Sequence, residues 1–253
     1  MTSRYRALPA ILAACTISLA ATACSSGDEL ADAPKDSKTF EFTGTNLSIE
    51  SNASELELVP ADIQDIQVER QVSGSVNGNA PESEWVLAGN TLTLKTGCAG
   101  VSISCKARYV VKVPRNAVIS AENTDGSIQA SEISTDLTAT TGKGNIRLNN
   151  FSGHKLDLTS DNGNIAGDRI SAPSVTATSD NGEVQLRFGA VPDNVGVKSD
   201  DGNVELALPE SDYRVDTKTK HGKVTVSVAE SSASMRAIQV DTRNGDISIM
   251  NGQ

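Results

Sequence analysis

Hydrophobic and polar residues alternate along most of the chain, in two short arms on either side of a recurring glycine. The residues seven and five positions before this glycine, and two and four positions after it, are almost all aliphatic or small. Strict alternation is typical of a β-strand with one buried face, and no helical period runs through this region. Each repeat is therefore predicted to form two strands joined by a corner. The corner glycines are Gly126, Gly144, Gly163, Gly182, Gly202, Gly222 and Gly245.

These glycines are spaced 18, 19, 19, 20, 20 and 23 residues apart. A period of about 20 residues is typical of a solenoid, in which each coil stacks on another. The corner sequence is TSDNGNI at Thr159–Ile165, with close variants in the other repeats. Asn-Gly and Asp-Gly pairs call for a positive φ, which glycine tolerates. All variation in length falls in the opposite turn, which contains Pro173, Pro192 and Ser211.

We therefore expect an all-β fold, a parallel, right-handed, single-stranded β-helix-like solenoid with about seven regular coils of 19–20 residues. Equivalent columns in every coil favour parallel stacking, because residues one coil apart become neighbours about 4.8 Å apart. Right-handed winding is the default for parallel crossovers. The alternative is an antiparallel meander of hairpins, which would not need equivalent columns.

Residues 1–23 have the features of an export signal. Arg4 and Arg6 precede an apolar run that is too short and too weakly apolar for a stable membrane span. Small residues stand directly before Cys24 and a polar stretch follows it, which resembles the lipobox of bacterial lipoproteins. The resemblance implies that Cys24 is acylated, with palmitate among its chains, and that the protein is extracytoplasmic and held on the cell membrane.

Two alternatives to acylation at Cys24 stay open. Cys15 also follows small residues, but cleavage there would leave a short apolar run before the site and an apolar tail after it. An ordinary secretory signal would make Cys24 incidental.

The rest of the chain divides into a flexible tether at 24–38, an N-terminal β cap at 39–114 and the regular solenoid at 115–253, with 39–253 as one domain. Residues 40–58 form a degenerate copy of the repeat, with Ser54 in the glycine position. From Pro60 to about Leu94 the register fails, and the strand pairing of this stretch is left open. A first coil must differ from the others, because its outer edge would otherwise pair with another chain.

Cys98 and Cys105 enclose a short loop. In an exported protein this arrangement predicts a disulfide, worth about 2–3 kcal/mol through loop entropy. A metal site would need more thiols or nearby histidines, and His154 and His221 are the two histidines of the sequence.

The run from this cysteine pair through Ala107–Pro114, Val118–Ala121 and Thr124–Ile128 resembles the bacterial putative-adhesin family of β-strand-repeat proteins. The shared pattern is an alternating strand ending in Val-Pro, then a strand ending in a Gly-x-Ile corner, then further copies. The resemblance covers about residues 40–252. It implies a parallel β-solenoid, often lipid-anchored, and it carries over no catalytic residue.

Charge and composition narrow the function classes. The formal net charge is −10, and removing Arg4 and Arg6 with the signal leaves 20 basic and 32 acidic residues, or −12. This sign argues against nucleic-acid binding. Aromatic residues make up 3% of the chain, which argues against a sugar cleft lined with stacked rings. No cofactor is expected.

Two groups of corner residues are candidates for chemistry. Stacked carboxylates on consecutive coils repel one another, and Ca²⁺ could relieve this, although the pattern lacks a known calcium-loop spacing. A solvated acidic face is the plainer interpretation. His221 is expected beside Asp201 and Asn244, as a surface ion pair or, much less favoured, in a nucleophile–His–Asp arrangement. The weak calcium candidates are Asp161, Asp180, Glu183, Asp200 and Asp201.

These observations predict a non-catalytic, lipid-anchored envelope protein that presents its solenoid surface for adhesion or protein interaction, with an envelope protein or polymer as partner. The alternative is a polysaccharide-acting β-helix enzyme, but the short coils and minimal turns supply no walls for a cleft. Ile247 and Ile249 stand close to Gln253, so no further element is expected to cover that coil, and an edge-to-edge dimer is possible there.

Overall fold

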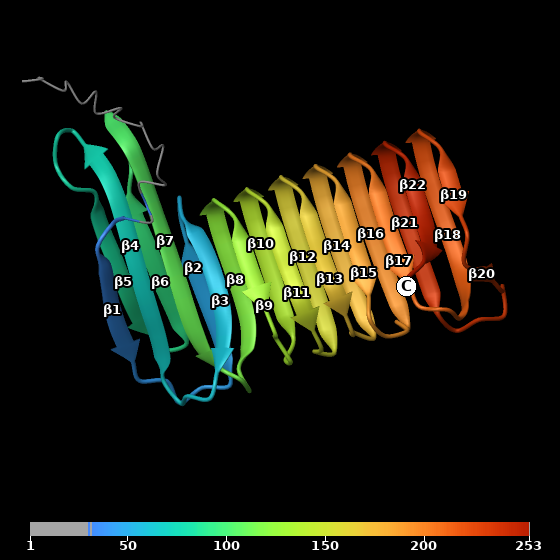
Figure 1. Ribbon diagram of the computed structural model, residues 1–253, viewed down its shortest axis with the longest axis horizontal. Helices are drawn as coiled ribbons and strands as arrows, with labels where there is room; N and C mark the ends of the chain where they lie inside the picture. Colours follow the sequence, from blue (N-terminus) through green and yellow to red (C-terminus); the bar gives the residue numbers. More distant parts are fainter. Residues whose placement is uncertain (1–29, 31, 253) are drawn as a thin grey trace, which may run out of the picture.

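The computed structural model describes residues 30 and 32–252, and it is built entirely of β-strands and turns. Two sheets of eleven strands face each other along the whole length of the molecule (Figure 1). In sheet A the order is β1-β4-β7-β3-β9-β11-β13-β15-β17-β22-β19. In sheet B it is β20-β18-β21-β16-β14-β12-β10-β8-β2-β6-β5. Nearly all of the pairings are parallel, so the meander alternative is wrong.

The strands of the regular coils lie where the alternation predicts them. One strand of each pair belongs to sheet B and ends at the corner, and its partner begins the return in sheet A. The pairs are β8 (Val118–Asp125) and β9 (Ile128–Ser131), β10 (Leu137–Lys143) and β11 (Ile146–Phe151), β12 (Lys155–Asn162) and β13 (Ile165–Ile170), β14 (Ser174–Asn181) and β15 (Val184–Phe188), β16 (Asn194–Asp201) and β17 (Val204–Leu208), β18 (Asp212–His221) and β19 (Val224–Val226), and β21 (Ala237–Asn244) and β22 (Ile247–Asn251).

The columns predicted from the sequence are confirmed by the register. Leu137, for example, pairs with Ile119 on one side and with Leu156 on the other. The inward-facing side chains of both sheets interdigitate in a single continuous core. The strand pairing is the same for either hand of winding, so the right-handed winding stays a prediction.

The N-terminal part supplies two more coils and a set of antiparallel strands. The degenerate copy of the repeat forms β2 (Asn46–Ser51) and β3 (Glu55–Ala61), which pair in parallel with β8 and β9. The unassigned stretch forms β4 (Ile66–Val76), β5 (Glu82–Ala88) and β6 (Thr91–Gly97), followed by β7 (Ser102–Pro114). β4 is antiparallel to β7, and β5 is antiparallel to β6.

The boundary of the expected tether is wrong. β1 (Lys35–Phe40) pairs antiparallel with β4, so residues 35–38 belong to sheet A. Leu30 is also packed into the domain, with 2% of its surface exposed. The folded part therefore begins closer to Cys24 than the polar composition predicted.

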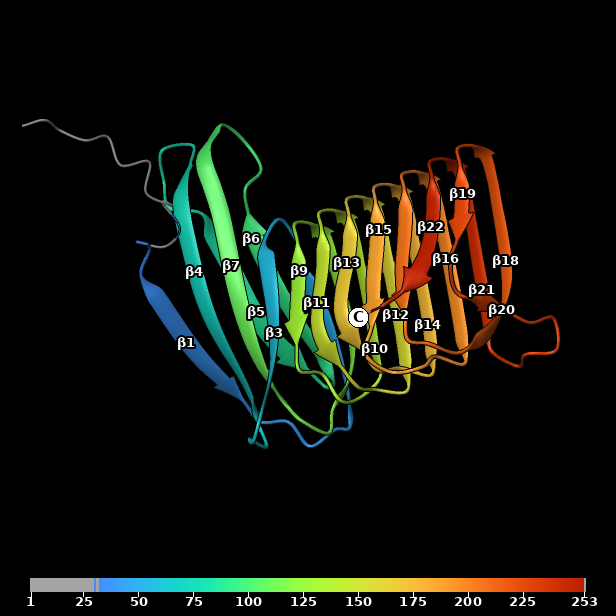
Figure 2. The same ribbon diagram turned by 45° about the vertical axis from the view of Figure 1, so that its right-hand side comes forward.

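The coils are not stacked in the order of the sequence. The C-terminal pair β21 and β22 lies between the coil of β16 and β17 and the coil of β18 and β19, as Figure 2 shows. The N-terminal coil of β2 and β3 is likewise enclosed, with β8 and β9 on one side and β6 and β7 on the other. The expectation that Ile247 and Ile249 lie on an uncovered edge is wrong, because both are buried between neighbouring coils.

Candidate interaction surface

The corner glycines are required by close packing of one coil on another. A Cβ atom on Gly163 would overlap the carbonyl oxygen of Gly144, and the same overlap recurs at the other corners. Positive φ values are found at Gly126, Gly144 and Gly245 and not at the remaining corners. The sequence-based explanation from φ is therefore incomplete, because the shared cause is the approach of the neighbouring backbone.

A buried ladder of hydroxyl groups lies beneath the corners, and the sequence interpretation missed it. Three residues before each glycine from Gly144 onward, a serine or threonine hydroxyl donates to the carbonyl oxygen of the glycine on the adjacent coil, at 2.8 to 3.2 Å. These bonds satisfy carbonyl groups that the corner turns away from both sheets. The sequence does show a Ser or Thr three residues before each of these glycines, which could have indicated the ladder. The donors are Thr141, Ser160, Ser179, Ser199, Thr219 and Thr242.

The acidic residues proposed for calcium divide into three columns. Glu183 lies apart from the others, after the corner glycine, where its backbone N–H donates to the Asn164 side chain at 2.9 Å. Asp161, Asp180 and Asp200 stack on successive coils, and Arg243 follows on the inserted coil with an ion pair of 2.9 Å to Asp200. Asp201 lies one column further on, where it accepts a hydrogen bond from the Asn244 side chain. Among the described residues, no group of three His, Cys, Asp or Glu side chains is placed to hold a metal ion. Calcium binding at this edge stays a prediction.

His221 does not lie beside Asp201. The inserted coil places Asn244 between the two residues, since Asn244 pairs with His221 on one side and with Asp201 on the other. The expected ion pair between His221 and Asp201 is therefore wrong, and a catalytic arrangement that joins them is wrong for the same reason.

The predicted disulfide between Cys98 and Cys105 is confirmed, with its Cα atoms 5.8 Å apart. It links the end of β6 to β7 at the N-terminal end of the solenoid. The proposed acylation site, Cys24, and the export signal lie outside the described residues. Within residues 30 and 32–252, no helix has the length and hydropathy needed to cross a bilayer.

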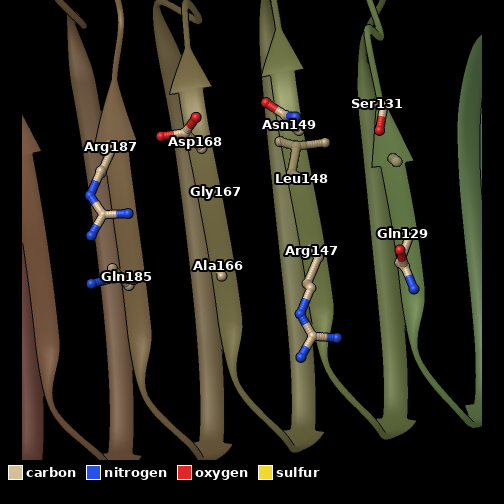
Figure 3. Close-up of a pocket in the computed structure, with 11 residues that line it drawn as sticks. Gln129, Ser131, Arg147, Leu148, Asn149, Ala166, Gly167, Asp168, Gln185 and Arg187 are labelled. Carbon is tan, nitrogen blue, oxygen red and sulfur yellow. The ribbon is translucent and has the colours of Figure 1, made fainter.

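The outer face of sheet A carries a shallow hollow of about 350 Å³ across β9, β11, β13 and β15. Figure 3 shows the reason: Ala166 is a small residue in an outward-facing row, and its neighbours Gln129, Arg147 and Gln185 have long side chains. Arg147 and Gln185 lie on either side of Ala166 in this row. A second hollow of about 130 Å³ adjoins it and shares Arg147, Ala166 and Gln185.

The charges around this hollow are unevenly paired. Arg187 lies 3.9 Å from Glu205, and Asp168 lies 3.6 Å from Arg169. Arg147 is exposed, and within the described part of the chain it has no ion pair or hydrogen-bonded side-chain partner. A guanidinium with unused donors beside amide groups can bind a carboxylate or another planar acceptor.

The hollow is an open depression on the surface of the sheet. Its lining combines amides, one unpaired guanidinium and small residues on a flat, rigid sheet. One feature of the sequence indicates the hollow. Ala166 is a single alanine in an outward-facing column with Gln129, Arg147, Gln185 and Glu205. That indication is weak, because short outward residues are common on solvent-facing strands.

Comparison with known proteins gives a family and a fold. Residues 35–250 match the family described as Toastrack DUF4097. The structure of a putative adhesin from Bacteroides fragilis is similar over 86% of this chain and 97% of its own, with 15% identity and a TM-score of 0.54. At this identity the likeness shows the fold alone. A putative adhesin from Parabacteroides distasonis aligns over 86% of this chain and 98% of its own, with 13% identity and a TM-score of 0.48. No curated protein matches the sequence.

Proposed function

The chain belongs to the Toastrack DUF4097 family, and we propose that it is a lipid-anchored envelope protein that binds a partner through the outer face of sheet A. Its role is non-catalytic, in adhesion or protein interaction. The observation that carries this proposal is the hollow around Ala166, where Arg147 lies exposed beside a gap in an otherwise continuous row of side chains.

The fold supports a binding role because it holds this face rigid. The side chains of sheet A that point inward are fully buried beneath the hollow, among them Ile146, Ile165 and Val184. A surface that is already ordered loses little conformational entropy when a partner binds. The similar structures bear the name of adhesins, which is consistent with a binding role.

The location follows from the export signal and from the lipobox ending at Cys24. Acyl chains on Cys24 would hold the folded domain at the outer surface of the cell membrane. The partner is then an envelope protein or polymer within reach of that surface. The disulfide between Cys98 and Cys105 is consistent with an oxidising compartment.

A matched pair of substitutions tests the contact face. Ala166→Arg fills the hollow on sheet A, whereas Thr176→Arg adds the same side chain to the exposed outer face of sheet B. Both variants and the unmodified protein are cross-linked in intact cells and recovered. We expect Ala166→Arg to lose the partner that the unmodified protein and Thr176→Arg retain. Equal recovery from all three would show that this face is not the contact surface.

A further inference from the structure

The N-terminal end of the solenoid carries an uncharged tip that projects from the molecule. It consists of residues 72–81 at the end of β4 and residues 97–105 around the disulfide, and we call it the hairpin tip. Figures 1 and 2 show the ends of β4 and β7 extending past the row of glycine corners. Its two segments are joined by hydrogen bonds between Asn77 and Val101 and by the pairing of Ser75 with Ile103.

The composition of the hairpin tip is unusual for this protein. It contains no Asp, Glu, Lys or Arg, in a chain of which 21% is charged. Val101 and Ile103 are 77% and 68% exposed, whereas most aliphatic residues at the inward positions of the sheets are buried. Exposed aliphatic side chains without charged neighbours are costly in water and favourable at the edge of a bilayer.

The tip lies beside the point where the chain enters the domain. Leu30 lines one surface hollow together with Cys98, Cys105 and Ala107. Its carbonyl oxygen accepts a hydrogen bond of 3.0 Å from the Gln71 side chain, which fixes it against β4. The chain therefore leaves towards Cys24 from the flank of the hairpin tip.

Residues 24–30 and residues 101–107 have a similar maximum length. Cys24 is six residues from Leu30, and six extended residues span at most about 20–22 Å. Val101 is six residues before Ala107, the neighbour of Leu30, and a chain segment of that length spans at most about 20 Å. If residues 24–29 are extended, an acylated Cys24 at the bilayer surface therefore lies at the level of Val101 and Ile103.

We propose that the hairpin tip is a membrane-contact site that inserts Val101 and Ile103 into the bilayer interface next to the acylated Cys24. The inference rests on the proposed anchor. The hairpin tip adds an apolar membrane contact to the lipid anchor. Two points of attachment fix the orientation of the solenoid relative to the membrane. The first charged residues below the tip are Lys106 and Glu82, of opposite sign, so the contact depends on the apolar side chains and responds little to the charge of the lipid.

The test uses the full acylated protein in phosphatidylcholine vesicles with brominated acyl chains, which quench tryptophan fluorescence on contact. Val101→Trp and Ile103→Trp place the probe at the tip. Met235→Trp is the matched control, because Met235 is 93% exposed on the loop at the other end of the solenoid. The unmodified protein supplies the background of Trp85, and intact mass shows whether Cys24 carries acyl chains.

We expect both tip variants to be quenched at least about twofold more strongly than Met235→Trp, with the acyl mass present. Equal quenching at both ends, or quenching at neither end, in the acylated protein would overturn the membrane contact and leave the anchor standing. A blue-shifted, concentration-dependent emission that bromine does not change would assign the tip to a second copy of the chain, and would also overturn it. A protein without acyl chains would overturn the anchor and the contact together.

Discussion

The two ends of the solenoid close in different ways. At the N-terminal end, antiparallel strands extend both sheets, and the guanidinium of Arg70 lies 4.2 Å from the centre of the Trp85 ring. At the C-terminal end, the coil of β18 and β19 is the last layer, and β20 (Ala229–Glu230) covers only the first residues of β18. Val224 is 39% exposed there, and the inward-facing Thr217 is only partly buried.

The difference shows two solutions to the problem of a free sheet edge. The N-terminal end covers its core with new strands, an aromatic ring and a disulfide. The C-terminal end leaves an edge free and places Lys218 and Lys220 along it, which discourages pairing with other chains. At both ends the coil nearest the chain terminus is held between two other coils, so the C-terminal strands β21 and β22 do not form the exposed edge.

The largest expected effect is a greater loss of stability from a substitution in the inserted coil than from one in the end coil. Ile249→Ala removes a fully buried side chain of β22, between β17 and β19, and we expect a loss of about 4 kcal/mol in the free energy of unfolding. Val226→Ala, in β19, should lose about 1 kcal/mol because Val226 is only partly buried. Urea unfolding measures both. Equal losses would mean that β22 does not lie inside the stack.

The next effect compares a corner inside the stack with one at its end. Gly163→Ala forces a Cβ onto the Gly144 carbonyl with coils on both sides, and should cost about 3 kcal/mol. Gly222→Ala makes the same overlap with Gly245, but the end coil can move outward, so about 1 kcal/mol is expected. Gly196→Ala is the control, because a Cβ there meets no atom within 4 Å. A similar loss for Gly163→Ala and Gly196→Ala in thermal unfolding would contradict the close-packing explanation.

Removing the disulfide should weaken the N-terminal end alone. The double substitution Cys98→Ser and Cys105→Ser opens a loop with a sequence separation of seven, with an expected loss of about 2–3 kcal/mol. Hydrogen exchange should accelerate in β4, β6 and β7 and stay unchanged in β18 and β19. Acceleration along the whole solenoid would show that the two ends are coupled.

The smallest expected effect is a decrease in the free energy of unfolding at alkaline pH. It arises from two buried tyrosines, one near each end of the solenoid. Burial raises the pKa of Tyr109, partly offset by its hydrogen bond with Thr96 and by the charge of Arg70. Burial likewise raises the pKa of Tyr213, partly offset by Arg236. The unfolded chain loses these protons first, at about pH 10, so stability should fall as pH rises above that value.

The measurement is the free energy of unfolding from pH 9 to about pH 11. Tyr109→Phe should make the decline shallower and shift the curve by a constant at neutral pH, since the hydrogen bond with Thr96 is lost at every pH. Tyr213→Phe serves as the counterpart at the other end, where the hydroxyl donates to the Pro209 carbonyl. An unchanged slope in both variants would show that other groups cause the decline.

The sequence predicted some features of the candidate surface and not others. The alternation and the corner glycines predicted which residues face outward, and the cysteine spacing predicted the disulfide. The hollow at Ala166 and the level of the hairpin tip relative to Leu30 could not be predicted, because both depend on which strands lie side by side. The hydroxyl ladder was visible as a recurring Ser or Thr, but its partner is the carbonyl of another coil.

By itself the sequence determined the content of each coil: two alternating strands, a glycine corner, a variable opposite turn, and a first coil with Ser54 in the glycine position. Only the tertiary structure decided the order of the coils. The reason is physical, because every coil offers the same aliphatic column to its neighbours. Val215 and Ile238 hold the same position relative to their glycines, and in the fold Val195 pairs with Ile238.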